Sequence, residues 1–151
     1  MTGKSVSLAA STEARGGNCS ILLLDDNVEL AEAMKTYLEM ERYEVTIVGS
    51  GTEGLRSIMR SDFDVVVCDL MMPSLSGDKF FQAVEKVKPH LCDRFLFITG
   101  FGRSAALSAL GGRADGRVIF KPFNMSDLSA AILGILSQTT TPKDDDTDTV
   151  A

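Results

Sequence analysis

Three aspartates at the ends of two short apolar runs are the residues of this chain best suited to chemistry. Asp25 and Asp26 follow the apolar residues 21–24, and Asp69 follows the apolar residues 65–68. Carboxylates placed close together repel one another, and a pKa among them rises unless a cation lies between them. Mg²⁺ prefers oxygen ligands and often binds one or two carboxylates together with a phosphate. The three aspartates are therefore a candidate site for Mg²⁺ and a phosphoryl group.

A hydroxyl and an amine end two further apolar runs. Thr99 follows residues 95–98, and Lys121 follows residues 118–120 and precedes Pro122. Both side chains could donate to phosphoryl oxygens. Carboxylates serve as covalent phosphoryl acceptors, so Asp69 is the candidate nucleophile. Such a transfer depends mainly on positioning and electrostatics, which a cation and a lysine would supply.

Each of these residues also has a structural interpretation. Asp26 or Asn27 could cap the helix that follows. Asp69 could be a turn residue before a proline-containing loop, Thr99 a strand-end threonine, and Lys121 a solvated surface lysine. Each signal is weak alone. Their order along the chain, with each one at the end of an apolar run, favours a shared site.

The elements that must position these side chains alternate between strands and helices. We predict strands near residues 20–25, 44–48, 63–68, 94–98 and 116–120, and helices near 27–41, 51–60, 77–88, 103–110 and 125–137. This alternation predicts an α/β fold with right-handed crossovers and a doubly wound parallel sheet. Ligands bind such sheets at the carboxyl ends of the strands, which is where the candidate residues lie.

Composition limits the functions that the chain can have. The chain has 151 residues, a formal net charge of −6 and three cysteines without metal-ligand spacing. No concentrated basic face indicates nucleic-acid binding, and no apolar run is long enough to cross a membrane. An odd cysteine count without a signal peptide favours the cytoplasm. We expect a flexible arm over 1–18, one folded domain over 19–137 and a disordered acidic tail over 138–151.

Residues 20–137 resemble the receiver domain of two-component response regulators, a bacterial signalling family. The residues that carry the resemblance are Asp25-Asp26, Asp69 with Met72-Pro73 and Gly77, Thr99, and Lys121-Pro122-Phe123. The resemblance implies a flavodoxin-like fold with a five-stranded sheet in the order 2-1-3-4-5. It also implies a cis bond between Lys121 and Pro122.

The same resemblance implies a signalling protein and not an enzyme. A histidine kinase or histidine phosphotransfer protein would transfer its phosphoryl group to Asp69, assisted by Thr99 and Lys121. Mg²⁺ would bind Asp25, Asp26, Asp69 and the backbone carbonyl of Met71. We expect a single-domain, monomeric response regulator that acts as a phospho-switch or a phosphate sink through contacts with another protein.

Two departures from the usual receiver pattern concern switching. Val118 stands where most receivers have Tyr or Phe, and Gly100 stands where most have Ala. The stretch 95–102 is similar to a receiver subgroup called FAT GUY, in which the aromatic switch is absent.

Three alternatives remain open at this point. Phosphohydrolases that resemble haloacid dehalogenases use Mg²⁺ and an aspartyl nucleophile, but they carry a second acid where this chain has Met71. A pseudo-receiver would bind partners without phosphorylation, which the complete acidic cluster and Lys121 argue against. The chain could also be the receiver portion of a hybrid histidine kinase.

Overall fold

The computed structural model describes residues 18–72, 75–100, 102, 108, 110 and 117–150, with the backbone alone for 139–150. The strands are β1 (Ser20–Leu24), β2 (Glu44–Val48), β3 (Val65–Asp69), β4 (Phe95–Thr99) and β5 (Val118–Phe120). The helices are α2 (Val28–Met40), α3 (Gly51–Arg60), α4 (Gly77–Val87), the 3-10 helix η1 (Pro89–Arg94) and α6 (Met125–Val150).

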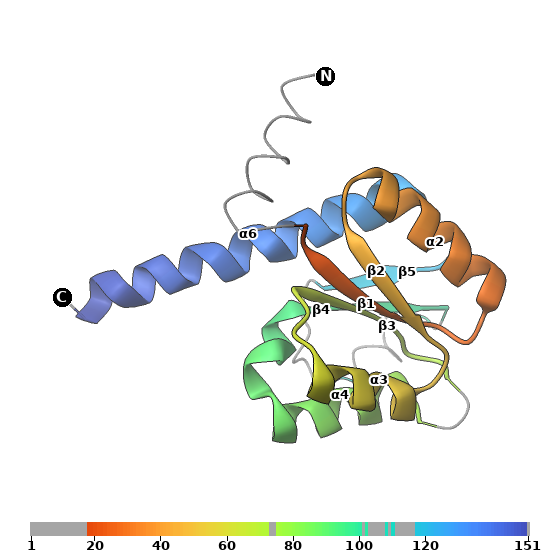
Figure 1. The fold of residues 1–151 in the computed structure, drawn as a ribbon, viewed down its shortest axis with the longest axis horizontal. Helices are drawn as coiled ribbons and strands as arrows, with labels where there is room; N and C mark the ends of the chain where they lie inside the picture. Colours follow the sequence, from red (N-terminus) through yellow and green to blue (C-terminus); the bar gives the residue numbers. More distant parts are fainter. Residues whose placement is uncertain are drawn as a thin grey trace.

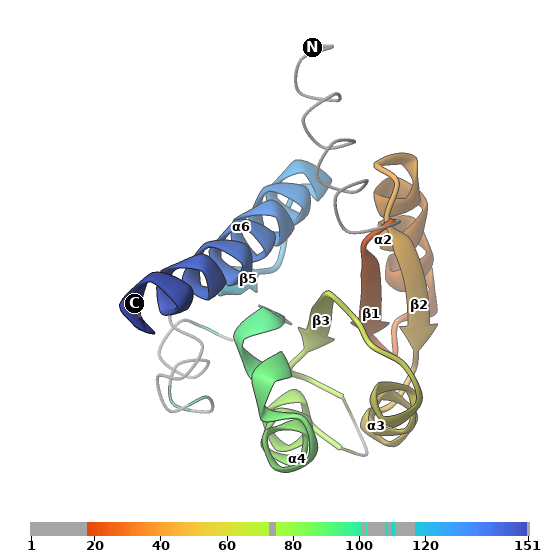
Figure 2. The same cartoon turned by 60° about the vertical axis from the view of Figure 1, so that its left-hand side comes forward.

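The strands form one parallel sheet in the order β2-β1-β3-β4-β5, which confirms the predicted fold. Helices cover both faces (Figure 1). Helices α2 and α6 lie on one face of the sheet, and α3 and α4 lie on the other, as the turned view in Figure 2 also shows. The strand order reverses between β1 and β3, so the crevice expected of such folds lies at the carboxyl ends of these two strands.

Alternating strand residues divide the core into two layers. Leu22, Val66 and Phe97 point to the α3–α4 face, whereas Leu23, Val67 and Leu96 point to the α2–α6 face. Strands with apolar side chains on both faces are stable only when both faces are covered. The runs of apolar residues in β1, β3 and β4 therefore select the doubly wound arrangement.

Four phenylalanines fill the layer under α4. Rings of Phe81 and Phe95 meet edge to face with centroids 5.0 Å apart, and Phe81 meets Phe97 in the same way at 5.3 Å. Phe80 packs against Phe95 at 5.8 Å. Aromatic pairs in these geometries stabilise a core beyond their area burial. The cluster fixes α4 against β4, and it thereby fixes the loop that leads from Asp69 into α4.

Helix starts agree closely with the sequence. The Ser50 hydroxyl accepts from the backbone N–H of Glu53 at 3.2 Å, and the Glu53 carboxylate accepts from the backbone N–H of Gly49 at 3.1 Å. This reciprocal pattern is a capping box with its return bond shifted by one residue. It fixes the beginning of α3 directly after β2.

Two elements differ from the sequence predictions. The predicted helix over 125–137 is longer than predicted, because α6 continues to Val150; the disordered acidic tail over 138–151 stays a prediction. The apolar stripe that set the predicted end marks only the part that packs on the sheet, whereas backbone hydrogen bonding can continue without it. The 3-10 helix η1 was not predicted, because its six residues carry no periodic pattern.

The predicted fourth helix, 103–110, lies mostly outside the described residues, although Ser108 and Leu110 are helical. Of the flexible arm predicted over 1–18, residues 1–17 also lie outside them. Among the described residues, no helix has the length and hydropathy needed to cross a membrane.

Candidate functional site

The carboxyl ends of β1 and β3 bring the three candidate aspartates together. One carboxylate oxygen from each of Asp25, Asp26 and Asp69 lies within 4.8 Å of the others. Asp25 and Asp69 are buried, with 2% and 3% of their surface exposed, while Asp26 is exposed to solvent. The cluster therefore has two anions inside the crevice and one at its rim.

Asp25 is the most constrained member of the cluster. Its Oδ1 accepts from the backbone N–H of Asn27 at 2.9 Å, while its Oδ2 is buried and has no hydrogen-bond partner in the part of the chain that the structure describes. Burial raises the pKa of Asp25 to about 6; the neighbouring Asp69 also raises it, and the Asn27 N–H opposes both. Such an orphaned buried oxygen is costly unless a donor or cation meets it.

The helix-capping alternative is decided in favour of Asn27. The Asn27 side chain accepts from the backbone N–H of Leu30 at 3.1 Å and caps α2. Because Asn27 takes this structural role, Asp26 remains available to the cluster. Adjacent residues thus divide the two functions that the sequence alone could not separate.

Asp69 is held by one donor on each carboxylate oxygen. Its Oδ1 accepts from the backbone N–H of Met71 at 2.9 Å, and its Oδ2 lies 3.4 Å from Lys121 Nζ. The lysine is partly buried, with 30% of its side chain exposed. One cation thus faces three carboxylates, and the negative charge of the crevice is only partly balanced.

Thr99 and Lys121 lie at the ends of the two neighbouring strands β4 and β5. Thr99 is fully buried, and its carbonyl accepts from the backbone N–H of Lys121 at 2.8 Å. This bond continues the β4–β5 pairing to the ends of both strands, and in the β3–β4 register Asp69 pairs with Ile98, the residue before Thr99. The Lys121–Pro122 bond is cis, as the resemblance implied.

Gly77 packs directly against the backbone that carries Asp69. A Cβ atom at this position would lie 2.6 Å from the Asp69 carbonyl oxygen and 2.8 Å from the Leu70 Cα. The Gly77 N–H also donates to the Leu70 carbonyl at 3.3 Å. The resemblance to receiver domains included this glycine, and the fold explains why the position is a glycine: α4 begins directly against the end of β3.

The remaining predicted site features are described in part. Met71 is half-exposed, with 48% of its surface accessible, and its carbonyl remains a predicted ligand. Gly100 and Gly102 are exposed after β4, whereas Phe101 and residues 103–107 lie outside the described residues. The sequence missed the two backbone donors, Asn27 N–H and Met71 N–H, because main-chain donors leave no residue-type signal.

The donor set fits a hard divalent cation. Three carboxylates supply oxygen ligands, and the Oδ2 of Asp25 lacks any other partner among the described residues. Mg²⁺ binds through few carboxylates and retains open positions for water and phosphate. Asp26 at the rim leaves the cluster open to solvent, as a site that receives a substrate requires.

Taken with the fold, this geometry defines a class: flavodoxin-like α/β domains with an acidic crevice at the strand switch point. The family model for response regulator receiver domains matches residues 21–133. Two curated relatives agree over most of this chain. The CpxR homologue of Haemophilus influenzae, a transcriptional regulatory protein, is 33% identical over 81% of this chain and 52% of its own length. The response regulator SaeR of Staphylococcus aureus is 32% identical over 78% of this chain and 50% of its own length.

A solved structure shows the same architecture. The CheY-like receiver domain protein of Methanospirillum hungatei superposes with a TM-score of 0.76 at 25% identity, covering 83% of this chain and 99% of that one. The chain therefore belongs to the response regulator receiver domain family. It spans about half the length of the curated relatives that it matches. The FAT GUY subgroup stays a prediction.

Proposed function

We propose that Asp69 accepts a phosphoryl group from a phosphohistidine of a histidine kinase or histidine phosphotransfer protein. The observation that carries the proposal is the placement of Asp69: it is buried at the switch point, with two other carboxylates and one lysine around it. A structural aspartate would be expected to have its charge balanced by its neighbours. Here the uncompensated negative charge supports a site that receives a cation and then a phosphoryl group.

The transfer is a displacement at phosphorus. An Asp69 carboxylate oxygen forms the new bond to phosphorus, and the bond from phosphorus to the donor imidazole nitrogen breaks. The electron pair of that bond stays on the imidazole nitrogen, and the imidazole leaves as a neutral ring because its other nitrogen carries a proton. The product is an acyl phosphate on Asp69 and an unmodified histidine on the donor.

The proposed cofactor is Mg²⁺, held by Asp25, Asp26 and Asp69, with the Met71 carbonyl as a further ligand. When bound, the ion neutralises negative charge on the carboxylates and on the transferring phosphoryl group. The chain's own residues supply the remaining positioning. The Met71 N–H holds Asp69 Oδ1 in place and leaves Oδ2, which faces Lys121 Nζ, as the oxygen nearer to a positive charge.

Lys121 and Thr99 would then respond to the new anion. Phosphorylation adds a charge of about −1.5 to −2 and three acceptor oxygens. Lys121 would exchange its contact with the carboxylate for one with a phosphoryl oxygen, and the Thr99 hydroxyl would donate to another. Val118 has no ring to move, so we place the resulting change in the loop after Thr99 and in the surface beside β5. A partner protein would recognise this surface, or the domain would serve as a phosphate sink.

The test is phosphoryl uptake from a small donor such as acetyl phosphate, measured as added mass on the intact protein. Wild-type protein should take up one phosphoryl group with Mg²⁺ and none with the metal chelated. Asp69→Asn should take up none. Asp62→Asn, which changes an exposed carboxylate at the opposite edge of the sheet, should behave like wild type. Normal labelling of Asp69→Asn would overturn the assignment, and rapid repeated hydrolysis would favour a phosphohydrolase.

The organisation of the whole protein is a separate proposal. We infer that the protein is a single-domain regulator in the cytoplasm. The alternative is that this domain is part of a longer protein, because the chain spans about half the length of the curated relatives. An antibody against this domain, used on a cell extract, would detect a species of about the size of this chain. A much larger species would identify the domain as part of a longer regulator or hybrid kinase.

A further inference from the structure

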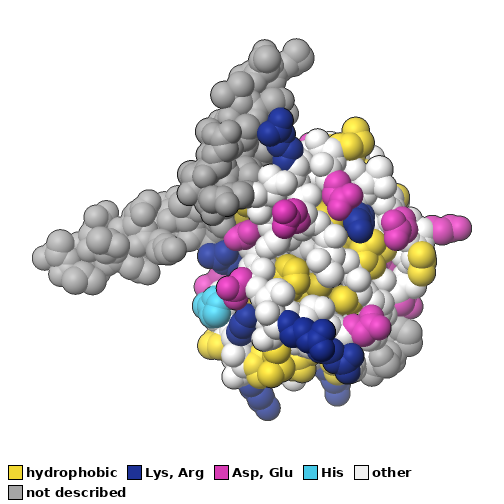
Figure 3. All heavy atoms as spheres, in the orientation of Figure 1, with side chains coloured by type: hydrophobic (Ala, Val, Ile, Leu, Met, Phe, Trp, Pro, Cys, Tyr) yellow, Lys and Arg dark blue, Asp and Glu magenta, His cyan; other side chains and the backbone are white. Residues whose placement is uncertain are grey.

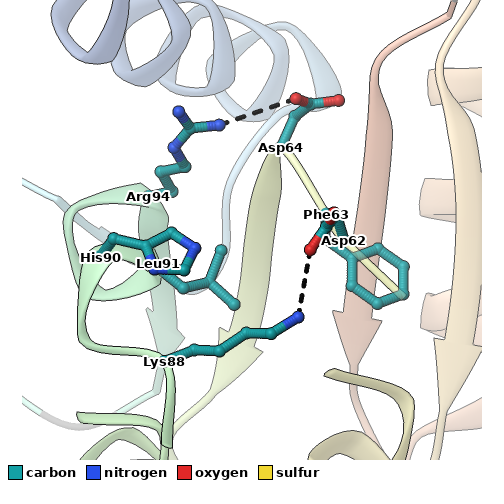
Figure 4. Close-up of a pocket in the computed structure, with 7 residues that line it drawn as sticks. All are labelled: Asp62, Phe63, Asp64, Lys88, His90, Leu91 and Arg94. Atoms are coloured by element: carbon teal, nitrogen blue, oxygen red, sulfur yellow. Dashed lines mark hydrogen bonds and ion pairs between the residues drawn. The ribbon is translucent and has the colours of Figure 1, made fainter. Parts of the chain in front are cut away.

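The amino ends of the strands carry a second polar region, at the opposite edge of the sheet from the phosphoacceptor site. A pocket of about 250 Å³ lies there, lined by residues 62–64 and by Lys88, His90, Leu91 and Arg94 (Figure 4). Arg94 pairs with Asp64 at 3.6 Å, and Lys88 pairs with Asp62 at 3.1 Å. Because its charges are already compensated, the pocket itself offers little attraction to a charged ligand.

Lys88 instead joins the ends of two helices. Its Nζ donates to the carbonyls of Ile58 at 2.7 Å and Ser61 at 3.2 Å, both at the carboxyl end of α3. Lys88 itself directly follows α4. An ammonium group at a helix carboxyl end satisfies carbonyls that lack partners within the helix. The last turns of α3 and α4 are therefore held side by side.

Five exposed side chains lie on these two joined helices, in the last turns of each. We call this surface the α3–α4 patch, and it consists of Arg56, Met59, Arg60, Lys86 and Val87. Met59 has 64% of its surface exposed and Val87 has 45%. Figure 3 shows Lys and Arg side chains gathered over the part of the molecule where Figure 1 places α3 and α4, with hydrophobic side chains between them.

The three cations of the patch lack the compensation seen in the pocket. Neither Arg56, Arg60 nor Lys86 forms an ion pair with another of the described residues. Exposed cations next to exposed apolar side chains are the usual features of a surface that receives an acidic segment. An occupant of the patch should therefore carry several carboxylates and an apolar residue close to them.

The chain itself contains a segment with this composition. Asp144, Asp145, Asp146 and Asp148 lie within five consecutive positions, and Val150 follows them. With Lys143 included, residues 143–148 carry a net charge of −3, half of the −6 of the whole chain. No other five consecutive residues of the sequence contain four carboxylates.

The fold prevents α6 from bringing this segment to the patch of its own chain. Helix α6 packs on the face of the sheet opposite to α3 and α4, and it continues past the domain as a single helix to Val150 (Figures 1 and 2). The same projection makes the acidic segment accessible to a neighbouring molecule. A second copy of the chain is therefore the occupant that geometry and charge favour.

We propose that the acidic segment 144–150 of one copy docks on the α3–α4 patch of another. The contact joins different surfaces of the two copies, so it is heterologous and can add further copies in a chain. A patch of this size gives a weak contact, with a Kd on the order of 100 µM. The chain remains the predicted monomer when dilute and associates when concentrated. The phosphoacceptor site lies at the other edge of the sheet and stays accessible.

The test compares wild-type chain with two variants by sedimentation velocity at about 1 mM protein and about 20 mM salt, where charges are weakly screened. One variant, Arg56→Glu/Arg60→Glu/Lys86→Glu, reverses the patch but keeps the acidic segment. The other ends at Gln138 and keeps only the patch. Wild type should form dimers and larger species that dissociate at about 0.5 M salt, and each variant alone should be monomeric. An equimolar mixture of the two variants should form a dimer and nothing larger.

The mixture result separates head-to-tail docking from every symmetric contact, because each variant supplies the surface that the other lacks. Lys79→Glu changes the charge of an exposed lysine in the first turn of α4, and it should associate like wild type. Wild type that stays monomeric would overturn the proposal. So would a truncated chain that associates like wild type, or a mixture that shows no dimer. Circular dichroism of the triple variant should match wild type, and the truncated chain tests the proposal independently of the patch.

Discussion

The two edges of the sheet treat charge in opposite ways. At the carboxyl edge, three carboxylates face one lysine, and the buried Oδ2 of Asp25 has no partner among the described residues. At the amino edge, the ammonium group of Lys88 has three acceptors, and Asp64 accepts from Ser20 while it pairs with Arg94. Compensated charges stabilise a fold. Uncompensated ones cost stability and indicate a site that awaits a ligand.

The carboxyl edge also depends on close backbone packing, which two glycines allow us to separate from the effect of charge. Gly77 and Gly134 are both helical glycines, but a Cβ added at Gly77 would meet other atoms, whereas one added at Gly134 would lie in open space. Gly77→Ala would force Cβ against the Asp69 carbonyl oxygen and the Leu70 Cα, so we expect a loss of about 3 kcal/mol in unfolding free energy. Gly134→Ala has open space and gains helix propensity, so it should stabilise by about 0.5–1 kcal/mol.

Urea unfolding of both glycine variants measures this contrast. We also expect Gly77→Ala to lower phosphoryl uptake, because its clash displaces the loop after Asp69. Equal stability of the two variants would show that α4 does not approach β3 as closely as described.

At the amino edge, Lys88→Met should destabilise the fold by about 2 kcal/mol. The change keeps most of the aliphatic side chain but leaves the carbonyls of Ile58 and Ser61 without the ammonium donor. Phosphoryl uptake at saturating donor should not change, because the site lies at the other edge. Lys79→Met, on the exposed surface of α4, serves as the control and should stay within about 0.5 kcal/mol of wild type. A destabilisation no larger than that of the control would show that Lys88 does not stabilise the carboxyl end of α3.

At the carboxyl edge, lowering the pH should protonate Asp25 and so reduce the repulsion among the three carboxylates. The pKa of Asp25 is raised by burial to about 6 in the folded protein, above its ordinary value of 3.8. The folded state therefore binds a proton more readily than the unfolded state between these values, and the contribution of Asp25 to stability rises as the pH falls. From pH 7 to pH 5, in the absence of Mg²⁺, this contribution is about 1 kcal/mol.

Other carboxylates also titrate in this range, so the effect is measured as a difference between two proteins. Asp25→Asn lacks the titrating group and keeps an acceptor for the Asn27 N–H. Wild type should gain about 1 kcal/mol relative to Asp25→Asn between pH 7 and pH 5. Parallel pH profiles would contradict the raised pKa.

Much of this architecture could be predicted from the sequence. Apolar runs define β1, β3 and β4 to within two residues, because strands buried on both faces leave continuous hydrophobic segments, whereas the edge strand β2 has an alternating pattern. The polar residues at the carboxyl ends of these strands identified the crevice, because the carboxyl ends of parallel strands lie at the same edge of the sheet. The sequence did not show whether Asp26 or Asn27 caps α2, since both side chains can accept from an amide.

Long-range contacts account for what the sequence missed. The role of Lys88 depends on the carboxyl ends of α3 and α4 meeting, which no local pattern encodes. The close approach of Gly77 to Asp69 has the same origin. The predicted end of α6 was wrong because an apolar stripe reports packing, whereas the helix continues into polar residues.

The most direct test of the contrast between the two edges is the thermal stability of wild type and Asp25→Asn at pH 7, with and without Mg²⁺. Without metal, Asp25→Asn should melt about 3–5 °C higher than wild type, because it removes one of three clustered anions. Added Mg²⁺ should raise the melting temperature of wild type by mass action and leave that of Asp25→Asn nearly unchanged. If Asp25→Asn melts below wild type without metal, or keeps the full Mg²⁺-dependent rise, the carboxyl edge is not the strained, cation-binding site described above.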